Sequence, residues 1–282
     1  MTPYWEAPSP LAYFATLVER DADFPLFEAA VSLAQDEYPE LDFQSVMTEV
    51  DRLCERVQRR IPEDAGSLQR LQILNQFFFR ELGFGVNVND YYEPENSYIH
   101  QLLATRRGIP VSLGVLWLEM ASSLRLSVRG VGFPGHFLVK VNLPIGQAII
   151  DPATGKSLSA EQLSEMLAQV QPDSAPLSSW EVAGSTYLRS AQPREILARM
   201  LRNLKGIFEA QQDWVRMLAV QERLVVLLPD VWSEYRDRGL AHAALGHSDQ
   251  ALADLECYLV HTDELTDSEA IAERIEALRA SR

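Results

Sequence analysis

One internal repeat restricts the fold of this chain more than any other feature of its sequence. The segment LKGIFEAQQDWVRMLAVQERLVVLLP aligns with RGLAHAALGHSDQALADLECYLVHTD, so that Leu204 lies opposite Arg238 and Met217 opposite Ala251, an offset of 34 residues. Units of this length consist of two antiparallel helices, and they bury a continuous core only by stacking on neighbouring units. The C-terminal part is therefore predicted to be a stack of helices.

A period of 34 residues is that of tetratricopeptide repeats. Small residues at Gly239, Gly246 and Ala251 fall where two antiparallel helices approach each other, and Pro229 ends the first unit. The closing segment SEAIAERIEALRA is predicted to be a capping helix. Two units are too few to bury their own core, so we expect them to pack on the preceding domain. An ordinary helical bundle is the alternative.

The charge balance bears on the class of partner. Lys and Arg number 25 against 40 Asp and Glu, which gives a net charge of -15 over 282 residues. Such a chain repels nucleic-acid phosphates and anionic lipid headgroups, so the expected partner is a protein or peptide, basic or amphipathic, bound through the repeats. No apolar run reaches the length of a membrane span, and the start MTPYWEAPSP lacks the order of a signal peptide. We expect a soluble cytoplasmic protein.

The cysteines and histidines give no sign of a metal or a disulfide. Cys54 and Cys257 are far apart, without a CxxC, and none of the five histidines forms an i, i+4 pair on a helix. Cys54 lies in the apolar stripe of FQSVMTEVDRLCERVQRRI, where a thiol is usually buried and inert. The expectation is no metal, no cofactor and no disulfide.

The pattern changes along the chain from helical to strand-like. Residues 10–83 have helical periodicity, and a further apolar helix is expected to start at Pro110 or Val111 and to run to about Leu124. SVRGVGF, HFLVKVN and QAIID are short and β-branched, as strands are, with LPIG as the last turn, and a helix near 160–170 follows. The sequence thus predicts an α+β protein, mostly helical, with a small antiparallel sheet.

Two domains follow from these patterns. Residues 1–185 are predicted to form a helical lobe plus the sheet-containing core, and residues 190–282 the repeats with their capping helix. The Pro- and Ser-rich stretch QPDSAPLSS separates the two.

The predicted hairpin brings a histidine and an aspartate together. With LPIG as the turn, Asn142 pairs with Gln147, and counting outward places His136 opposite Ala153, two residues from Asp151. Because side chains alternate along a strand, His136 and Asp151 share a face and are expected to be hydrogen-bonded, away from the packed side. The opposite face is the predicted core face, with Phe137, Val139, Val141, Ala148 and Ile150.

A histidine paired with a carboxylate is what a general base needs. The carboxylate fixes the imidazole tautomer and leaves the other ring nitrogen to accept a proton from a nucleophile. Ser112, at the start of the predicted helix, is expected to face the pair across a cleft, where the helix dipole favours a nucleophile. Spacing alone does not distinguish this site from a structural hydrogen bond or from a turn opened by Asp-Pro.

The order of these motifs resembles the transglutaminase-like superfamily, a papain-related group with a Cys-His-Asp triad. DYYEPENSYIHQLLATRRGIPVSLGVLWLEMA, GVGFPGHFLVKV, DPATG and the repeats with LRNLK and YRDRGL are similar, over about residues 35–275, to bacterial SirB-type transglutaminase-like proteins that carry tetratricopeptide repeats. The resemblance implies a transglutaminase-like core. It matches His136 and Asp151 to the superfamily histidine and aspartate, and Ser112 to the position at or near the nucleophile. Asn96 and Tyr92 are the candidate substrate-binding residues.

Serine at the nucleophile position is a departure that bears on activity. A thiol starts from a pKa of about 8.5 and can be held as thiolate, whereas a serine hydroxyl needs a base and an oxyanion hole during the reaction. The upstream Gln of papain-type sites is replaced here by Arg106, Arg107 and Gly108. Neither Cys54 nor Cys257 lies where the triad requires it.

Three interpretations remain. In the first, which we take as the prediction, the core has lost catalysis wholly or nearly so, and the protein acts by binding a protein or peptide, in a regulatory role. In the second, Ser112, His136 and Asp151 form a hydrolase or acyl transferase acting on a protein or peptide amide. In the third, the cleft is purely structural.

Overall fold

The computed structural model describes residues 8–20, 24–144, 146–170, 186–262 and 267–280. The predicted separator QPDSAPLSS, residues 171–179, lies outside them.

Contacts within the chain divide it into two compact units. The core unit is Arg20–Met200, and the repeat unit joins Met1–Glu19 to Leu201–Arg282. The division falls inside one helix, α9 (Pro193–Ala210). The N-terminal helix α1 (Pro10–Val18) belongs to the repeat unit, because it packs against α10 (Trp214–Leu227).

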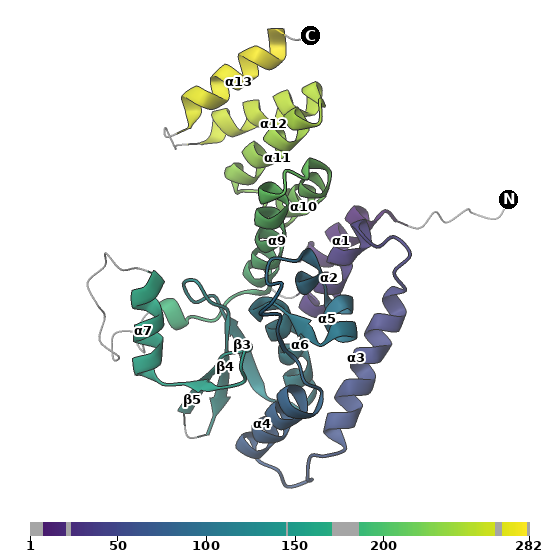
Figure 1. The fold of residues 1–282 in the computed structure, drawn as a ribbon, viewed down its shortest axis with the longest axis vertical. Helices are drawn as coiled ribbons and strands as arrows, with labels where there is room; N and C mark the ends of the chain where they lie inside the picture. The colour runs from purple at the N-terminus through teal and green to yellow at the C-terminus, as the bar shows by residue number, and fades with distance from the viewer. Residues whose placement is uncertain (1–7, 21–23, 145, 171–185, 263–266, 281–282) are drawn as a thin grey trace, which may run out of the picture. The chain divides into compact units, whose positions relative to one another are not determined.

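The core unit combines helices with two small sheets (Figure 1). Its helices are α2 (Leu26–Ser32), α3 (Phe43–Gln58), α4 (Ser67–Asn75), α5 (Ile99–Thr105), α6 (Pro110–Ser123) and α7 (Ala160–Val170). Short helical segments are η1 (Leu33–Asp36), η2 (Gln76–Glu81), η3 (Pro94–Ser97) and η4 (Thr186–Leu188). The strands are β1 (Gly85–Val86), β2 (Arg107–Gly108), β3 (Ser127–Val131), β4 (Leu138–Leu143), β5 (Gly146–Ile150) and β6 (Ser157–Leu158).

The larger sheet confirms the predicted hairpin. Its strands follow the order β3-β4-β5-β6 with antiparallel neighbours, and Asn142 pairs with Gln147 as the sequence indicates. Strands β1 and β2 form a separate parallel pair. The mostly helical α+β architecture is therefore confirmed.

Helices cover both faces of the larger sheet (Figure 1). On one face, Leu138 and Ile149 share a buried cluster with Leu163 and Leu167 of α7. On the other face, α6 packs against β3 and β4. The prediction of one packed and one open face is therefore wrong, because α7 buries the side that was expected to point away from the core.

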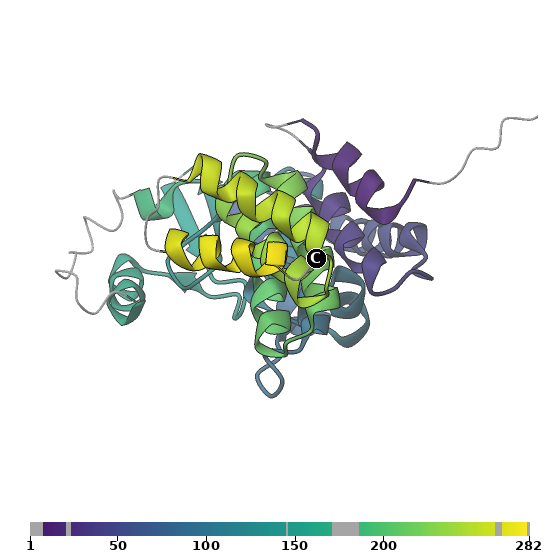
Figure 2. The same cartoon turned by 90° about the horizontal axis from the view of Figure 1, so that it is seen from above.

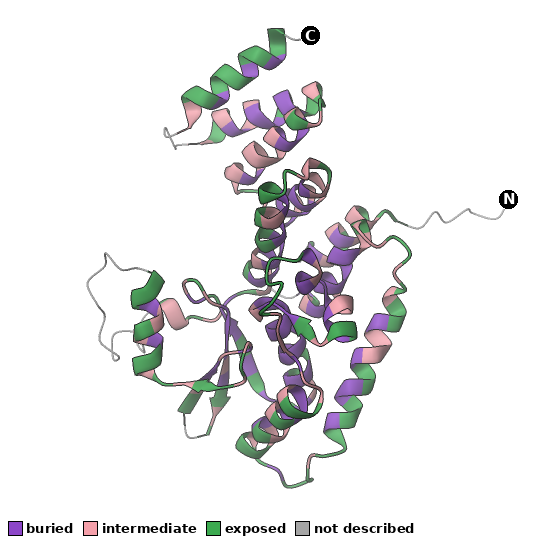
Figure 3. Ribbon diagram, in the orientation of Figure 1, coloured by how far each residue is buried: buried purple, intermediate pink, exposed green. Residues whose placement is uncertain are grey.

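Helix α6 is the centre of the core unit, and Figure 3 shows it buried along most of its length. It begins at Pro110, as predicted, because a proline in the first helical turn removes no needed N–H donor. Gly114 lets the sheet approach closely: a Cβ atom at this position would lie 2.4 Å from Cε1 of Phe137. Contact between α6 and the start of β4 thus depends on the absence of a side chain at Gly114.

The repeat unit stacks its helices in pairs. After α9 and α10 come α11 (Trp232–Ala244), α12 (Ser248–His261) and the closing helix α13 (Ser268–Ala280), which lies along α12 (Figure 2). A Cβ atom at Gly239 would lie 2.8 Å from Leu255 Cγ, so the predicted close approach of two helices is present here. Gly246 instead occupies a left-handed turn after α11, with φ of 76°.

Ion pairs connect the helices of the repeat unit with one another. The carboxylate of Glu234, whose side chain is 3% exposed, accepts hydrogen bonds from Arg202 and Lys205 of α9. Arg238 forms two hydrogen bonds of 2.7 Å with Asp254 of α12, and Arg236 one of 2.6 Å with Asp267. These arginines are bound within the unit.

Candidate functional site

Ser112 is fully buried, and its hydroxyl is bonded to main-chain atoms. The Oγ atom lies 2.7 Å from the carbonyl oxygen of Asn96 and 3.0 Å from that of Ile109, both acceptors for its single proton. It also accepts a hydrogen bond of 3.1 Å from the N–H of Ile109. A Cβ atom at Gly108 would lie 2.7 Å from this oxygen, so the surroundings are crowded. The Ser112 hydroxyl therefore holds the start of α6 to the main chain at Asn96 by hydrogen bonds.

Asn96, whose carbonyl oxygen accepts the Ser112 hydrogen bond, also holds the preceding loop, residues 87–92, through its side chain. Its Nδ2 donates to the carbonyl oxygens of Asp90 at 2.7 Å and Tyr91 at 3.2 Å, and its Oδ1 accepts from Nδ2 of Asn87 at 3.1 Å. Asn96 is 3% exposed, so these bonds are sheltered from water. The side chain of Asn96 has a structural role, because all three bonds end within this loop.

His136 lies in the turn before β4. Its main-chain N–H donates to the carbonyl oxygen of Phe133 at 3.0 Å, and Gly135 before it has a φ of 68°, which closes the turn. The side chain is partly buried. Within the described ranges, the imidazole has no hydrogen-bonding partner.

Asp151 lies in the turn after β5. Its Oδ1 accepts from the N–H of Ala153 at 2.8 Å, and its Oδ2 from the hydroxyl of Thr154 at 2.9 Å. Its carbonyl oxygen accepts from the N–H groups of Thr154 and Gly155. These bonds are those of an Asx turn, the structural alternative that the Asp-Pro pair suggested.

The structure does not join the three predicted residues into a hydrogen-bonded triad. In the parts of the chain that are described, Asp151 and Ser112 form their hydrogen bonds elsewhere, and neither is hydrogen-bonded to the His136 ring. The expected His136–Asp151 bond assumed that the β4–β5 ladder continues outward. The ladder ends at the pair Val139 and Ile150, so both residues lie beyond it in separate turns.

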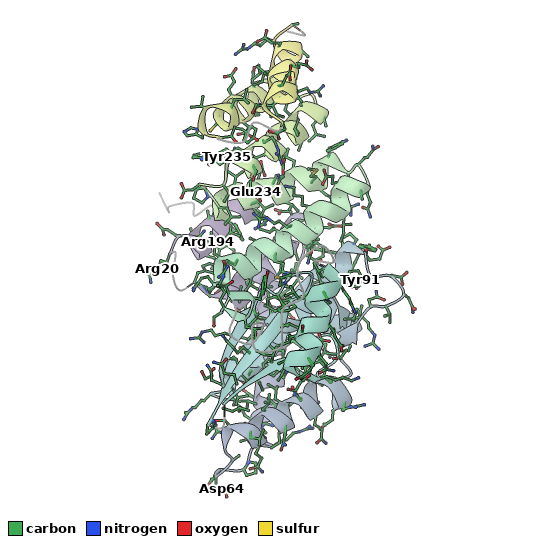
Figure 4. All side chains as sticks on the ribbon, turned by 90° about the vertical axis from the view of Figure 1, so that its left-hand side faces the viewer. Arg20, Asp64, Tyr91, Arg194, Glu234 and Tyr235 are labelled. Carbon is green, nitrogen blue, oxygen red and sulfur yellow. The ribbon has the colours of Figure 1, made fainter. Side chains whose placement is uncertain are left out.

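Tyr92, the other candidate substrate-binding residue, lies on the loop that is hydrogen-bonded to the Asn96 side chain. Its side chain is 78% exposed, beside Tyr91 at 41% and Val88 at 84%. The two tyrosine rings meet edge to face at 5.3 Å between centroids. Figure 4 places Tyr91 at the surface on this loop. Burial raises the pKa of the Tyr91 hydroxyl, with a further contribution from Tyr92. Sequence reasoning missed the role of Asn87, although its place in the turn-rich stretch VNVNDYY was a signal.

The remaining candidates for a site are the cysteine thiols and the side chains that could bind a metal ion. Cys54 is buried in α3 as predicted, and burial raises the pKa of its thiol. Across the described residues, no three His, Cys, Asp or Glu side chains are grouped as a metal site would require. None of the described helices is both long and apolar enough to cross a membrane.

Comparison with known proteins agrees with the two-part organisation. The family model of the transglutaminase-like superfamily matches residues 44–202, and that of a tetratricopeptide repeat matches residues 204–276. The junction between these matches lies near the division between the core and repeat units. No solved structure is significantly similar.

Several bacterial proteins are similar along most of their length. A UPF0162 protein of Xylella fastidiosa (strain Temecula1) is 36% identical over 240 residues, which cover 85% of this chain and 84% of the relative. The UPF0162 protein YchA of Escherichia coli K12 is 28% identical over 252 residues, covering 89% and 91%. The matches thus cover both the core and the repeats. The chain belongs to the transglutaminase-like superfamily and, with these relatives, to the UPF0162 proteins.

Proposed function

We propose that this chain is a protein-binding member of the transglutaminase-like superfamily that does not use Ser112 as a nucleophile. The observation that carries the proposal is the bonding of the Ser112 hydroxyl to Asn96 and Ile109 inside the protein. A nucleophile must reach both a base and a substrate carbonyl. A hydroxyl with 0% exposure, fixed by main-chain partners, reaches neither without rearrangement of the helix start.

Serine in place of cysteine adds to this argument. A thiol at a helix start beside a charged histidine ionises near neutral pH, because both lower its pKa. A serine hydroxyl does not ionise near neutral pH, so it becomes a nucleophile only when a base is already hydrogen-bonded to it. The resemblance of the motif order to SirB-type proteins is our ground for proposing a regulatory role, which we place in the cytoplasm. The hydrolase remains the competing function at Ser112, His136 and Asp151, and the following experiment separates the two.

We expect a fluorophosphonate probe to leave the full-length protein unlabelled, because the serine oxygen is buried and bonded. The probe is applied to wild type, Ser112→Ala and Ser112→Cys, and intact mass is measured. A thiol-directed iodoacetamide probe on Ser112→Cys, with Cys54 and Cys257 replaced by serine, tests access to the same position. Stoichiometric fluorophosphonate labelling that disappears in Ser112→Ala would establish a serine hydrolase and refute the proposal.

Two parts of the chain support the binding half of the proposal. Tetratricopeptide repeats commonly mediate protein–protein interactions through their stacked helices. The loop with Val88, Tyr91 and Tyr92 exposes large apolar side chains beside the acidic Asp90 and Glu93. Rigid aromatic rings next to carboxylates suit a basic partner, since lysine and arginine bind both ring faces and carboxylates. We propose this loop as a contact surface for such a partner.

A photo-crosslinking amino acid placed at Tyr92 is expected to trap a partner in cells that express the full-length protein. The matched control is the same amino acid at Leu68 of α4, which is also an exposed apolar residue of the core unit, at 46%. The readout is a higher-mass adduct on a gel, identified by mass spectrometry. Adducts of equal intensity at both positions, or at neither, would count against the loop as a contact surface.

A further inference from the structure

Arg199 of α9 is a partly buried arginine that forms no ion pair with a carboxylate in the described part of the chain. It lies in the part of α9 that belongs to the core unit. Another arginine of this helix, Arg202, is bonded to the carboxylate of Glu234. Acidic residues number 40 against 25 basic ones, so carboxylates are not scarce in this chain. Arg199 thus keeps donors for a group from outside the chain.

One long hydrogen bond orients the guanidinium of Arg199. Its Nη1 donates to the carbonyl oxygen of Phe133 at 3.4 Å, and the same oxygen accepts from the main-chain N–H of His136 at 3.0 Å. The guanidinium therefore lies at the turn before β4 that contains His136. Its other two nitrogens, Nε and Nη2, form no hydrogen bond with the described residues, and neither is shut off from solvent.

These two nitrogens form an edge with which arginine binds carboxylates. Their N–H groups point in nearly the same direction, so they can donate to the two oxygens of one carboxylate. The protein uses this edge in its repeat unit, where Nε and Nη2 of Arg238 each lie 2.7 Å from an oxygen of Asp254. Arg199 has the same edge unbonded, and the bond from Nη1 to Phe133 fixes the plane of the group.

The surroundings of Arg199 favour an anion. Burial lowers the pKa of the guanidinium because it disfavours the charged form, and the charge of the Tyr91 hydroxyl acts in the opposite direction. An anion at a partly buried cation is screened less by water and salt than one at an open surface. The rings of Tyr91 and Tyr92, in contact edge to face, supply exposed apolar surface near this charge.

From this arrangement we infer that Arg199 binds one carboxylate of the partner protein through Nε and Nη2, beside the rings of Tyr91 and Tyr92. The carboxylate is the C-terminal group of the partner or an acidic side chain, which share this chemistry. Asp90 and Glu93 on the same loop disfavour further negative charge, so the rest of the bound segment is neutral or basic. The inference rests on the proposed function, because it names a group on the partner that contacts the Tyr92 loop.

Small probes test this site on the full-length protein without any partner. N-acetylphenylalanine carries the carboxylate of a C-terminus, N-acetylglutamic acid α-amide carries that of a side chain, and N-acetylphenylalanine amide carries none. The main-chain N–H signals of Tyr91 and His136 and the Nε–H signal of Arg199 are followed by NMR during titration. The two acids are expected to give saturating shifts with a Kd of about 1–10 mM, and the amide none. The acid that binds more tightly identifies the source of the carboxylate.

Arg199→Gln is expected to weaken binding of the acids by about tenfold or more, and Arg199→Lys by about threefold or more, because lysine keeps the charge and loses the two-donor edge. The matched control is Arg125→Gln, at an exposed arginine next to the opposite end of the β3–β4 pair, which should leave the affinity unchanged. Equal binding of acid and amide, no saturating shift, or an unchanged affinity in Arg199→Gln would overturn the inference.

The crosslinking experiment at Tyr92 separates this inference from the proposed function. Arg199→Gln is expected to reduce the yield of the Tyr92 adduct by about tenfold, in parallel with its effect on the acids. Probe binding without any Tyr92 adduct would refute the partner at the loop, and with it the assignment of the carboxylate to a partner. A Tyr92 adduct whose yield is unchanged in Arg199→Gln would refute the Arg199 site alone.

Discussion

Replacing Phe137 by alanine is expected to lower the free energy of unfolding of the core unit by about 3–5 kcal/mol. The ring is 2% exposed and lies between the sheet and α6, against the space left by Gly114 and Gly130. Truncation leaves a cavity at the contact that joins α6 to β4, and the rigid surroundings fill it only in part. Hydrogen exchange with mass spectrometry measures this loss for peptides of the core unit separately from those of the repeat unit.

A second substitution makes this prediction specific to the contact. Gly114→Ala alone should destabilise the core unit by about 1–3 kcal/mol, because the new methyl group overlaps the Phe137 ring. In the Phe137→Ala background the space is free, and the same change should be neutral or should stabilise by up to about 1 kcal/mol through helix propensity. Additive effects of the two substitutions would show that the ring and the glycine do not interact.

Local patterns in the sequence were sufficient to predict the β4–β5 hairpin and the start of α6. Placing the turn at LPIG predicted the pairing of Asn142 with Gln147, because the position of a hairpin turn sets the register of its strands. Proline at position 110 predicted the start of α6 for the reason that it needs no donor there. These predictions depend on neighbours in sequence, and the structure confirms them.

The candidate site could not be predicted in the same way, because it lies where regular structure ends. Extending the strand count outward to His136 and Asp151 assumed a continuous ladder, but Gly135 and Pro152 accompany turns at both positions. Gly135 and the Asp151-Pro152 pair are turn signals in the sequence, and at these positions the chain forms turns although the alternation of a strand continues. The bond from Ser112 to Asn96 spans 16 residues and joins two main-chain segments, which no periodic pattern indicates.

The partners of charged residues in the repeats could not be predicted from the sequence either. Arg236 and Arg238 stand between apolar positions of the repeats, as partner-binding residues do. The structure pairs them with Asp267 and Asp254, 31 and 16 residues away. Whether a surface charge meets a ligand or a neighbouring helix depends on the stacking of the helices, which the sequence period specifies only as a repeat length.

Asn96→Ala is expected to lower the free energy of unfolding of the core unit by about 2–3 kcal/mol. The change removes two hydrogen bonds that the side-chain amide donates to Asp90 and Tyr91 and one that it accepts from Asn87. All three are made by a residue with 3% exposure, where water replaces them poorly. The matched control is Asn142→Ala, an exposed asparagine of β4 whose single side-chain bond reaches Ser127, with an expected effect within about 0.5 kcal/mol.

The effect of Asn96→Ala should also be local. The hydrogen bond from Ser112 ends on the main-chain oxygen of Asn96, which alanine retains, so the start of α6 should keep its protection from hydrogen exchange. Residues 87–92 should instead exchange faster, because the loop loses its internal support. Crosslinking from Tyr92 should fall with the order of this loop, since a partner would then have to immobilise it on binding. If exchange rises equally at Ile109 and in the loop, Asn96 acts on the whole helix start and not on the display of Tyr92.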